Sequence, residues 1–258
     1  MAHVSRRRPP RPWPGPVRPV DPADLVGPRG LTEEVLREDC CDAPESGPAQ
    51  FFWSLLTTER RTRIQSVVDA RLQSVTVVLD RLLDPHNTAA ILRTAEGLGL
   101  SRAHVVAHAA GDAVAHRRVT QDAHKWIDVE AHPGGETAAE KLRADGYEVW
   151  AGHLDAGGRL YTTLPADRPV ALLFGNEHEG PSPATVRACT GTFRIPMAGF
   201  TQSFNVSVAA GIALAWLADA RRRHLGQPGD LSGEARVQLR DRYTLLAARL
   251  ARRMKAGR

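Results

Sequence analysis

Three polar segments of the chain hold the residue types that could bind a ligand or carry out chemistry. The first, DRLLDPHNTAAILRTAE, runs from Asp80 into a predicted helix and contains Asn87 and Arg93. Asn87 can cap that helix, and Arg93 can be a solvated helix residue, so neither needs a further role. Taken alone, this segment favours a structural interpretation.

The second segment, LLFGNEHEGPS, covers residues 172–182. A buried apolar strand ends at Gly175, where the missing side chain permits close backbone approach to a ligand. Asn176 and Glu177 follow directly. A connecting loop with Ser182 as a helix cap is the alternative, but an amide and a carboxylate crowded at a strand end favour a site.

The third segment, RIPMAGFTQSFNVSVAAGIAL, covers residues 194–214 and passes from a glycine-containing loop into a helix of small residues. Ser203, Asn205 and Ser207 form a dense polar cluster before that helix. Ser203 can act as the N-cap, yet a buried helix does not need the whole cluster. The segment therefore favours a polar ligand.

Several familiar catalytic motifs are missing. The first predicted strand is not followed by GxGxxG, and neither GxxxxGK[ST] nor GxSxG occurs, which excludes a Rossmann dinucleotide site, a P-loop and the usual nucleophile elbow. The ten histidines show no HExxH or other tight metal spacing, so no metal is expected.

The elements that must position the three segments alternate along the chain. The pattern predicts strands over 74–80, 103–108, 124–132, 147–152, 169–175 and 193–197. It predicts helices over 87–99, 136–146, 182–189 and 203–224. This alternation indicates one α/β domain with a mostly parallel sheet and helices on both faces. Each polar segment then follows the carboxyl end of a strand, where open sheets of this kind bind ligands.

Charge is distributed unevenly over the 258 residues, whose formal net charge is +5. Residues 1–30 have a net charge of +4 and residues 221–258 one of +8, whereas residues 31–220 have one of −7. Basic ends favour a polyanionic partner, with nucleic acid ahead of a membrane, although they can also act only as solubilising tails.

Flanking helices complete the predicted organisation. Residues 1–31 read as a disordered, proline-rich basic tail, residues 32–74 as a helical extension, residues 75–225 as the main domain and residues 226–258 as a basic C-terminal helix. The helix over 58–72 follows an aromatic trio, Phe51, Phe52 and Trp53, which we expect to anchor it on the main body. In the last helix, over 232–254, an apolar seam consists of Leu239, Tyr243, Leu246 and Leu250. The other faces of this helix carry arginines, which include Arg240.

The compartment follows from what the sequence lacks. It contains no apolar run of 18 residues or more and no signal-peptide core at the N-terminus. Cys40, Cys41 and Cys189 are too sparse for a disulfide framework. We therefore expect a cytoplasmic protein without a membrane span.

The three polar segments resemble the three signature motifs of the SPOUT methyltransferases, TrmH branch. They occur in the same order and at comparable separations, and the resemblance covers roughly residues 55–225. The matched motif residues are Asn87, Arg93, Glu177, Ser203 and Asn205.

The resemblance implies a fold and a cofactor that periodicity does not show. It implies a deep trefoil knot in the C-terminal part of the domain and a homodimer with each active site near the subunit interface. It implies S-adenosyl-L-methionine as the cofactor, bound in a pocket that is lined by Gly152, Gly175, Ile195 and Phe204. Phe204 departs from the family, which usually has leucine there.

Within that branch the chain most resembles the enzymes that methylate the ribose of guanosine 18 in the tRNA D-loop. The segments TERRTRI and AHKWIDV and the basic last helix are similar to theirs. Ribosomal RNA members often have a separate RNA-binding domain, for which residues 32–75 are too short. Ribosomal RNA 2′-O-methylation, including antibiotic-resistance enzymes, and a non-catalytic RNA-binding protein of the same fold are the alternatives.

The resemblance implies that Arg93 is the central catalytic residue and takes the hydroxyl proton with help from a substrate phosphate. Arginine normally stays protonated, so we expect it to hold phosphate and to stabilise the developing alkoxide. Asn87, Glu177, Ser203 and Asn205 would orient Arg93, the RNA and the cofactor, without a metal. The presence of all these residues argues against a non-catalytic protein.

Overall fold

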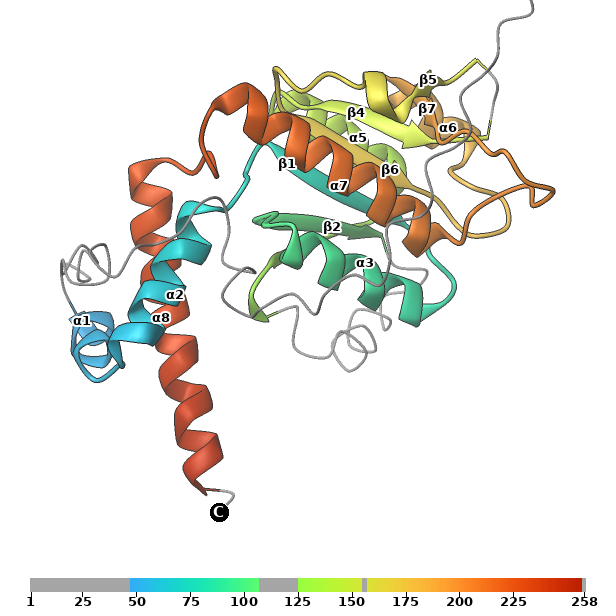
Figure 1. Ribbon diagram of the computed structural model, residues 1–258. Helices are drawn as coiled ribbons and strands as arrows, with labels where there is room; N and C mark the ends of the chain where they lie inside the picture. The colour runs from blue at the N-terminus through green and yellow to red at the C-terminus, as the bar shows by residue number, and fades with distance from the viewer. Residues whose placement is uncertain (1–46, 107–124, 155–156, 257–258) are drawn as a thin grey trace, which may run out of the picture. The chain divides into compact units, whose positions relative to one another are not determined.

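A computed structural model of the chain describes residues 47–106, 125–154 and 157–256. The tail predicted over 1–31 lies outside these ranges. The helices and strands, in chain order (Figure 1), are α1 (Gly47–Ser54), α2 (Thr58–Asp69), β1 (Val75–Asp80), α3 (Pro85–Gly97), β2 (Arg102–Val106), β3 (Asp128–His132), α5 (Gly135–Ala144), β4 (Glu148–Gly152), β5 (Arg159–Leu160), the 3-10 helix η2 (Tyr161–Thr163), β6 (Val170–Phe174), α6 (Pro183–Ala188), β7 (Gly191–Arg194), α7 (Val206–Leu225) and α8 (Gly233–Ala256).

Within the described residues, seven strands form one sheet in the order β3-β2-β1-β6-β4-β7-β5. Every pairing in it is parallel. The neighbouring inner strands β1 and β6 are buried along their whole length, as is typical of strands in a parallel sheet with both faces covered. The predicted α/β class with a parallel sheet is confirmed.

Helices cover both faces of the sheet, as predicted (Figure 1). Alternate residues of β1 serve the two sides: Val77 packs in the core beneath α3 and α7, whereas Val78 packs in the core beneath α5 and α6. The small residues of α7 let that helix come close to its neighbours, since Ala210 and Ala213 are completely buried. This side of the core supports the loops that follow β1 and β7.

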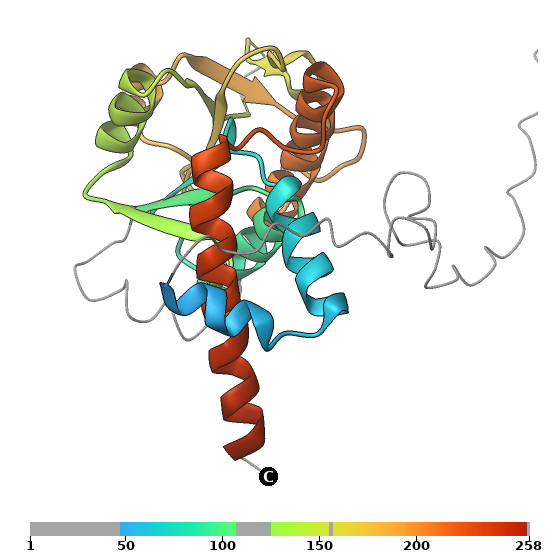
Figure 2. The ribbon, with the colours of Figure 1, turned by 90° about the vertical axis from the view of Figure 1, so that its left-hand side faces the viewer.

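The helix α8 packs against α1 and α2 (Figure 2). Trp53 of the aromatic trio is buried and Phe51 is 62% exposed. The helix α1 packs mainly against α8, and the anchoring of α2 by the trio stays a prediction. The apolar seam of α8 buries Tyr243 edge-on against Trp126. Arg240 is 5% exposed, so it does not belong to the basic exterior that the sequence predicted.

Two strands, β3 and β7, differ from the prediction by three residues or more at one end. The strand expected over 124–132 begins only at Asp128, because the Trp126 carbonyl accepts hydrogen bonds from Arg71 and Tyr243 instead of joining the sheet. The strand expected over 193–197 ends at Arg194, before Pro196, which lacks a backbone donor. The two-residue strand β5, which was not predicted, extends the sheet beside β7.

No helix in the described part of the chain has the length and apolar character that crossing a membrane requires.

Candidate active site

A pocket of about 600 Å³ opens where β4, β6 and β7 end. This is the expected place for a ligand in a parallel sheet, and the volume lies in the range of small-molecule sites. The loop after β6 and the loop between β7 and α7 form much of its wall. All four residues predicted to line a cofactor site lie in it: Gly152, Gly175, Ile195 and Phe204.

Two aromatic rings and a glycine line the pocket at the strand ends. Phe174 ends β6 and Phe193 lies in β7, and their rings meet edge to face with centroids 5.8 Å apart. A side chain at Gly152 would lie 3.4 Å from both rings, which is ordinary contact. The pocket thus combines apolar ring edges with the backbone of three adjacent strands, which suits a ligand with an aromatic part and polar groups.

Gly175 is required by the loop that it begins. A Cβ atom there would lie 2.0 Å from the backbone nitrogen of Pro181, because the loop folds back over the strand end. The Gly180 N–H donates to the Asn176 carbonyl at 2.8 Å and closes this turn. The close backbone approach that the sequence predicted at Gly175 is therefore made by the chain's own loop, at the wall of the pocket.

The carboxylate of Glu177 collects three hydrogen bonds from the first polar segment. The backbone N–H of Leu83 donates at 2.8 Å and that of Asp84 at 3.2 Å. The Asn87 amide donates to the same carboxylate at 2.8 Å. Burial raises the pKa of Glu177, but the hydrogen bonds from Leu83, Asn87 and Asp84 outweigh it and leave the pKa below its ordinary value. The group is therefore a carboxylate at neutral pH and can only accept hydrogen bonds.

The same asparagine connects Glu177 to the third segment. The Asn87 side-chain oxygen accepts from the Asn205 amide at 3.1 Å, and Asn87 itself is buried. The Asn205 oxygen accepts from the backbone and the hydroxyl of Ser207, at 2.8 and 2.6 Å. A continuous chain of hydrogen bonds thus joins the loops after β1, β6 and β7, and three of the five predicted catalytic residues take part in it.

The helix caps differ from those predicted. Asp84, not Asn87, caps α3, and its carboxylate accepts from the His86 N–H. Asn205, not Ser203, caps α7, which therefore begins at Val206. Asn87 is thus released from capping, and its amide is free to bridge Glu177 and Asn205.

Ser203 and Arg93 are the two remaining residues predicted to be catalytic. Ser203 is exposed and lines the pocket. Arg93 is exposed on α3 and is not among the pocket-lining residues. Six residues along a helix correspond to about 9 Å and about 240° of rotation, so Arg93 faces a different direction from the buried Asn87.

Sequence reasoning missed part of the pocket wall, namely His153, Leu154, Met197 and Gln202. His153 and Leu154 directly follow β4, so the rule that ligands bind at the carboxyl ends of strands could have found them. Met197 and Gln202 belong to the third polar segment and could have been found by its position alone.

Comparison with known proteins places this geometry in a family. The family model described as SpoU rRNA Methylase matches residues 74–215, more than half of the chain. The chain belongs to this family. The matched residues run from β1 into α7, so the SpoU region contains the whole hydrogen-bond chain and the pocket, whereas α1, α2 and α8 lie outside it.

Individual SpoU relatives are close to this chain. The tRNA (guanosine(18)-2′-O)-methyltransferase of Thermus thermophilus is 36% identical over 158 residues, which cover 61% of this chain and 81% of the relative. The crystal structure of an A. aeolicus TrmH/SpoU tRNA modifying enzyme matches with a TM-score of 0.66 and 27% identity, over 73% of this chain and 96% of that one. An AdoMet-bound rRNA methyltransferase from Sinorhizobium meliloti is 33% identical, with a TM-score of 0.51, over 63% of this chain and 60% of that one.

Proposed function

We propose that this SpoU-family chain transfers a methyl group from S-adenosyl-L-methionine to the 2′-hydroxyl of guanosine 18 in tRNA. The observation on which this rests is the hydrogen-bond chain from Glu177 through Asn87 to Asn205, which joins the first motif loop to the two motif loops that line one pocket. The Thermus thermophilus relative, named for this reaction, supports the tRNA substrate over ribosomal RNA.

The pocket fits S-adenosyl-L-methionine, because its volume and its mix of ring edges and strand-end backbone suit a nucleoside with a polar tail. Gly152, Gly175, Ile195 and Phe204 would hold the cofactor. When bound, it supplies an electrophilic sulfonium methyl group, so the protein needs to position the hydroxyl and manage its proton. The AdoMet-bound relative from Sinorhizobium meliloti supports this cofactor.

The residues of this chain divide the remaining work. Glu177, Asn87 and Asn205 fix the relative positions of the three loops, since each of these side chains has its hydrogen-bonding partners in another loop or at the start of a helix. Ser203 stands exposed at the pocket, where its hydroxyl can contact the RNA or the cofactor. Arg93, exposed on α3, binds an RNA phosphate and stabilises the negative charge that develops on the 2′-oxygen.

Four exposed apolar side chains near the pocket support a homodimer. Phe200 is fully exposed and Val208 is 48% exposed in the third segment, and Leu83 is 48% exposed beside the network. Phe204, at the pocket itself, is 39% exposed. Exposed apolar side chains of this kind favour an interaction surface, so we propose that the subunit interface involves the first and third polar segments, next to each active site.

The finer architecture is part of the same proposal. Residues 75–225 form the methyltransferase domain with a C-terminal trefoil knot, residues 32–74 a helical extension, and residues 226–258 a basic helix that contacts RNA. The basic proline-rich segment 1–31 adds further phosphate contacts. These contacts make binding salt-sensitive and largely independent of sequence. We place the enzyme in the cytoplasm, where its tRNA substrate is found.

The decisive experiment measures tritiated methyl transfer from S-adenosyl-L-methionine to an unmodified tRNA transcript. The paired control is the same transcript with guanosine 18 replaced. Incorporation that disappears in the control supports both the chemistry and the target. Incorporation that persists refutes the target but not the chemistry, and inert tRNA and ribosomal RNA together would favour an RNA-binding protein without catalysis.

A further inference from the structure

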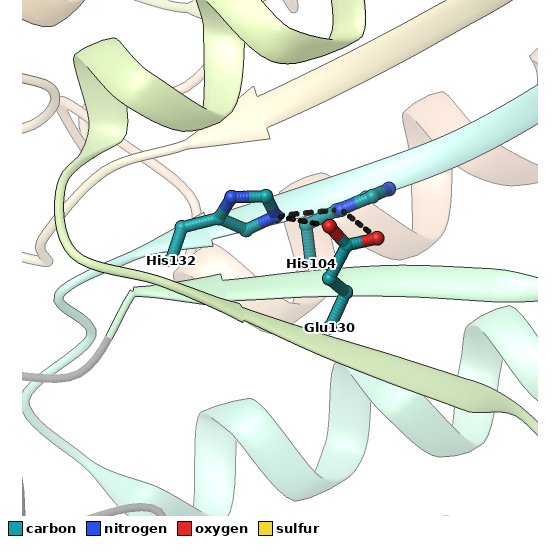
Figure 3. A group of neighbouring side chains, drawn as sticks. All are labelled: His104, Glu130 and His132. Atoms are coloured by element: carbon teal, nitrogen blue, oxygen red, sulfur yellow. Dashed lines mark hydrogen bonds and ion pairs between the residues drawn. The ribbon is translucent and has the colours of Figure 1, made fainter.

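Three metal-ligand side chains meet on the last two strands at one end of the sheet order, two strands away from the pocket-forming ones (Figure 3). His104 belongs to β2, and its register partner on β3 is Glu130. His132 lies two residues further along β3 and therefore on the same face as Glu130. Figure 3 shows the three side chains pointing toward one another.

The distances between the ligand atoms are those of a metal site. His104 Nδ1 and His132 Nε2 are 2.9 Å apart. The Glu130 carboxylate oxygens lie 3.8 Å from the first of these nitrogens and 3.7 Å from the second. Ligands bound tetrahedrally at about 2.0–2.1 Å stand about 3.3–3.4 Å from each other, and the three observed separations bracket that value.

We propose that His104, Glu130 and His132 bind a divalent transition-metal ion, for which zinc is the best match. Two imidazoles and one carboxylate form a common zinc ligand set, and three protein ligands leave a fourth position for water. The ion would tie the outermost strand, β3, to β2. It lies outside the methyl-transfer pocket, so the proposal is independent of the proposed function.

Burial of the two rings strengthens the assignment. The His104 and His132 side chains are 2% and 5% exposed. Glu130 is 31% exposed and so connects the site with solvent, which gives an ion a way in.

Two cations compete for the carboxylate. Lys141 Nζ, on α5, lies 3.2 Å from one Glu130 oxygen, and an Arg102 nitrogen lies 3.6 Å from the other. The alternative interpretation is therefore purely structural: the histidines hydrogen-bond to each other while Lys141 neutralises Glu130. Lys141 also lies 3.2 Å from Asp145, so its ammonium group has a second partner when an ion occupies the cluster.

The two interpretations predict different effects of replacing Lys141 on metal binding. If Lys141 competes with an ion for Glu130, then Lys141→Met raises metal affinity about tenfold, the size of one charge interaction at this distance in water. If the cluster is purely structural, Lys141→Met produces no metal binding. This variant leaves the proposed ligands intact.

The experiment uses the full-length protein, stripped with chelator and titrated with Co²⁺ and then with Zn²⁺ as competitor. We expect one ion per chain, a visible spectrum typical of tetrahedral Co²⁺, displacement by Zn²⁺ and a higher Tm with metal. His132→Gln and Glu130→Gln should each weaken binding by more than the about 10- to 100-fold cost of losing an outer-shell partner. His224→Gln, at an exposed position on α7, is the matched control and should bind like the parent.

Of the variants that remove a ligand, Glu130→Gln is the one least expected to disturb folding, because Glu130 is the most exposed of the three ligands. Circular dichroism of each variant establishes that it is folded before its affinity is compared. Absence of saturable binding by the parent protein overturns the proposal. A metal signal that survives both Glu130→Gln and His132→Gln in folded protein places the ion elsewhere and overturns it as well.

Discussion

Replacement of Glu177 by glutamine tests the central hydrogen-bond chain with almost no change of shape. A glutamine must place its NH2 group where one carboxylate oxygen now accepts from Leu83 or from Asp84 and Asn87, so at least one bond to a charged acceptor is lost. Such a bond is worth about 1.5–3 kcal/mol, and solvent at this half-buried group screens part of it. We expect the free energy of unfolding to fall by about 1–2 kcal/mol and Tm by about 2–8 °C.

The pH dependence of that loss follows from the lowered pKa of Glu177. Because its folded-state pKa lies below the unfolded value near 4.5, the carboxylate stabilises the fold above that pH, and the stabilisation disappears as pH falls through the folded pKa. In urea unfolding, the loss in free energy of unfolding caused by Glu177→Gln should therefore be largest at pH 7 and should disappear in acid. Methyl transfer at pH 7 should fall about 10- to 100-fold through misplaced loops.

Glu140→Gln, at an exposed position on α5, is the matched control for loss of one carboxylate. It should unfold like the parent protein at every pH. If Glu177→Gln is as stable as the parent at pH 7, or if its deficit is the same at pH 4 and pH 7, the hydrogen-bond chain does not hold the three loops and the reasoning is wrong.

Three further perturbations test other parts of the site. Gly175→Ala forces a Cβ atom to within 2.0 Å of the Pro181 nitrogen, so calorimetry should show loss of cofactor binding. The control is Gly97→Ala, where a Cβ atom would meet no atom within 4 Å, and this variant should bind the cofactor normally. Arg93→Ala should abolish methyl transfer. Cofactor affinity measured by calorimetry should stay within about twofold of that of the parent protein, because Arg93 is outside the pocket lining. Loss of both activities would place Arg93 in the cofactor site. Burial raises the pKa of Cys189 to about 12, so iodoacetamide at pH 8 should leave it unalkylated in the folded protein and alkylate it in urea. Peptide mass spectrometry measures this, and rapid labelling in the folded state would contradict the burial of Cys189.

The sheet and its helices could be predicted from sequence because their signals are local. The β-branched run over 74–80 and the apolar run over 169–175 predicted β1 and β6, and glycine at the ends of helices marked the turns. Element ends were less accurate where a distant group decided them. The start of β3 depends on Arg71 and Tyr243, whose bonds to the Trp126 carbonyl no local pattern reveals.

The candidate site shows the same division between local and distant information. Residue types identified Glu177 and Asn205 as unusual, and the family resemblance added Asn87, but spacing within one segment could not show that they touch across three loops. Local chemistry even pointed the wrong way for Asn87, because an asparagine at the start of a helix is a good cap. Asp84 takes that role three residues earlier, which a sequence that offers both residues leaves open.

The histidine cluster shows why an absence of motif is a weak argument against a metal. A search for tight spacing finds pairs of ligands on one helix or one loop, as in HExxH. Glu130 and His132 do have the two-residue spacing that places side chains on one face of a strand, but their third partner, His104, is separated from them by more than twenty residues of sequence. Parallel pairing of β2 with β3 is what brings His104 opposite Glu130. A ligand set assembled by strand register can therefore be recognised only once the order of the strands is known.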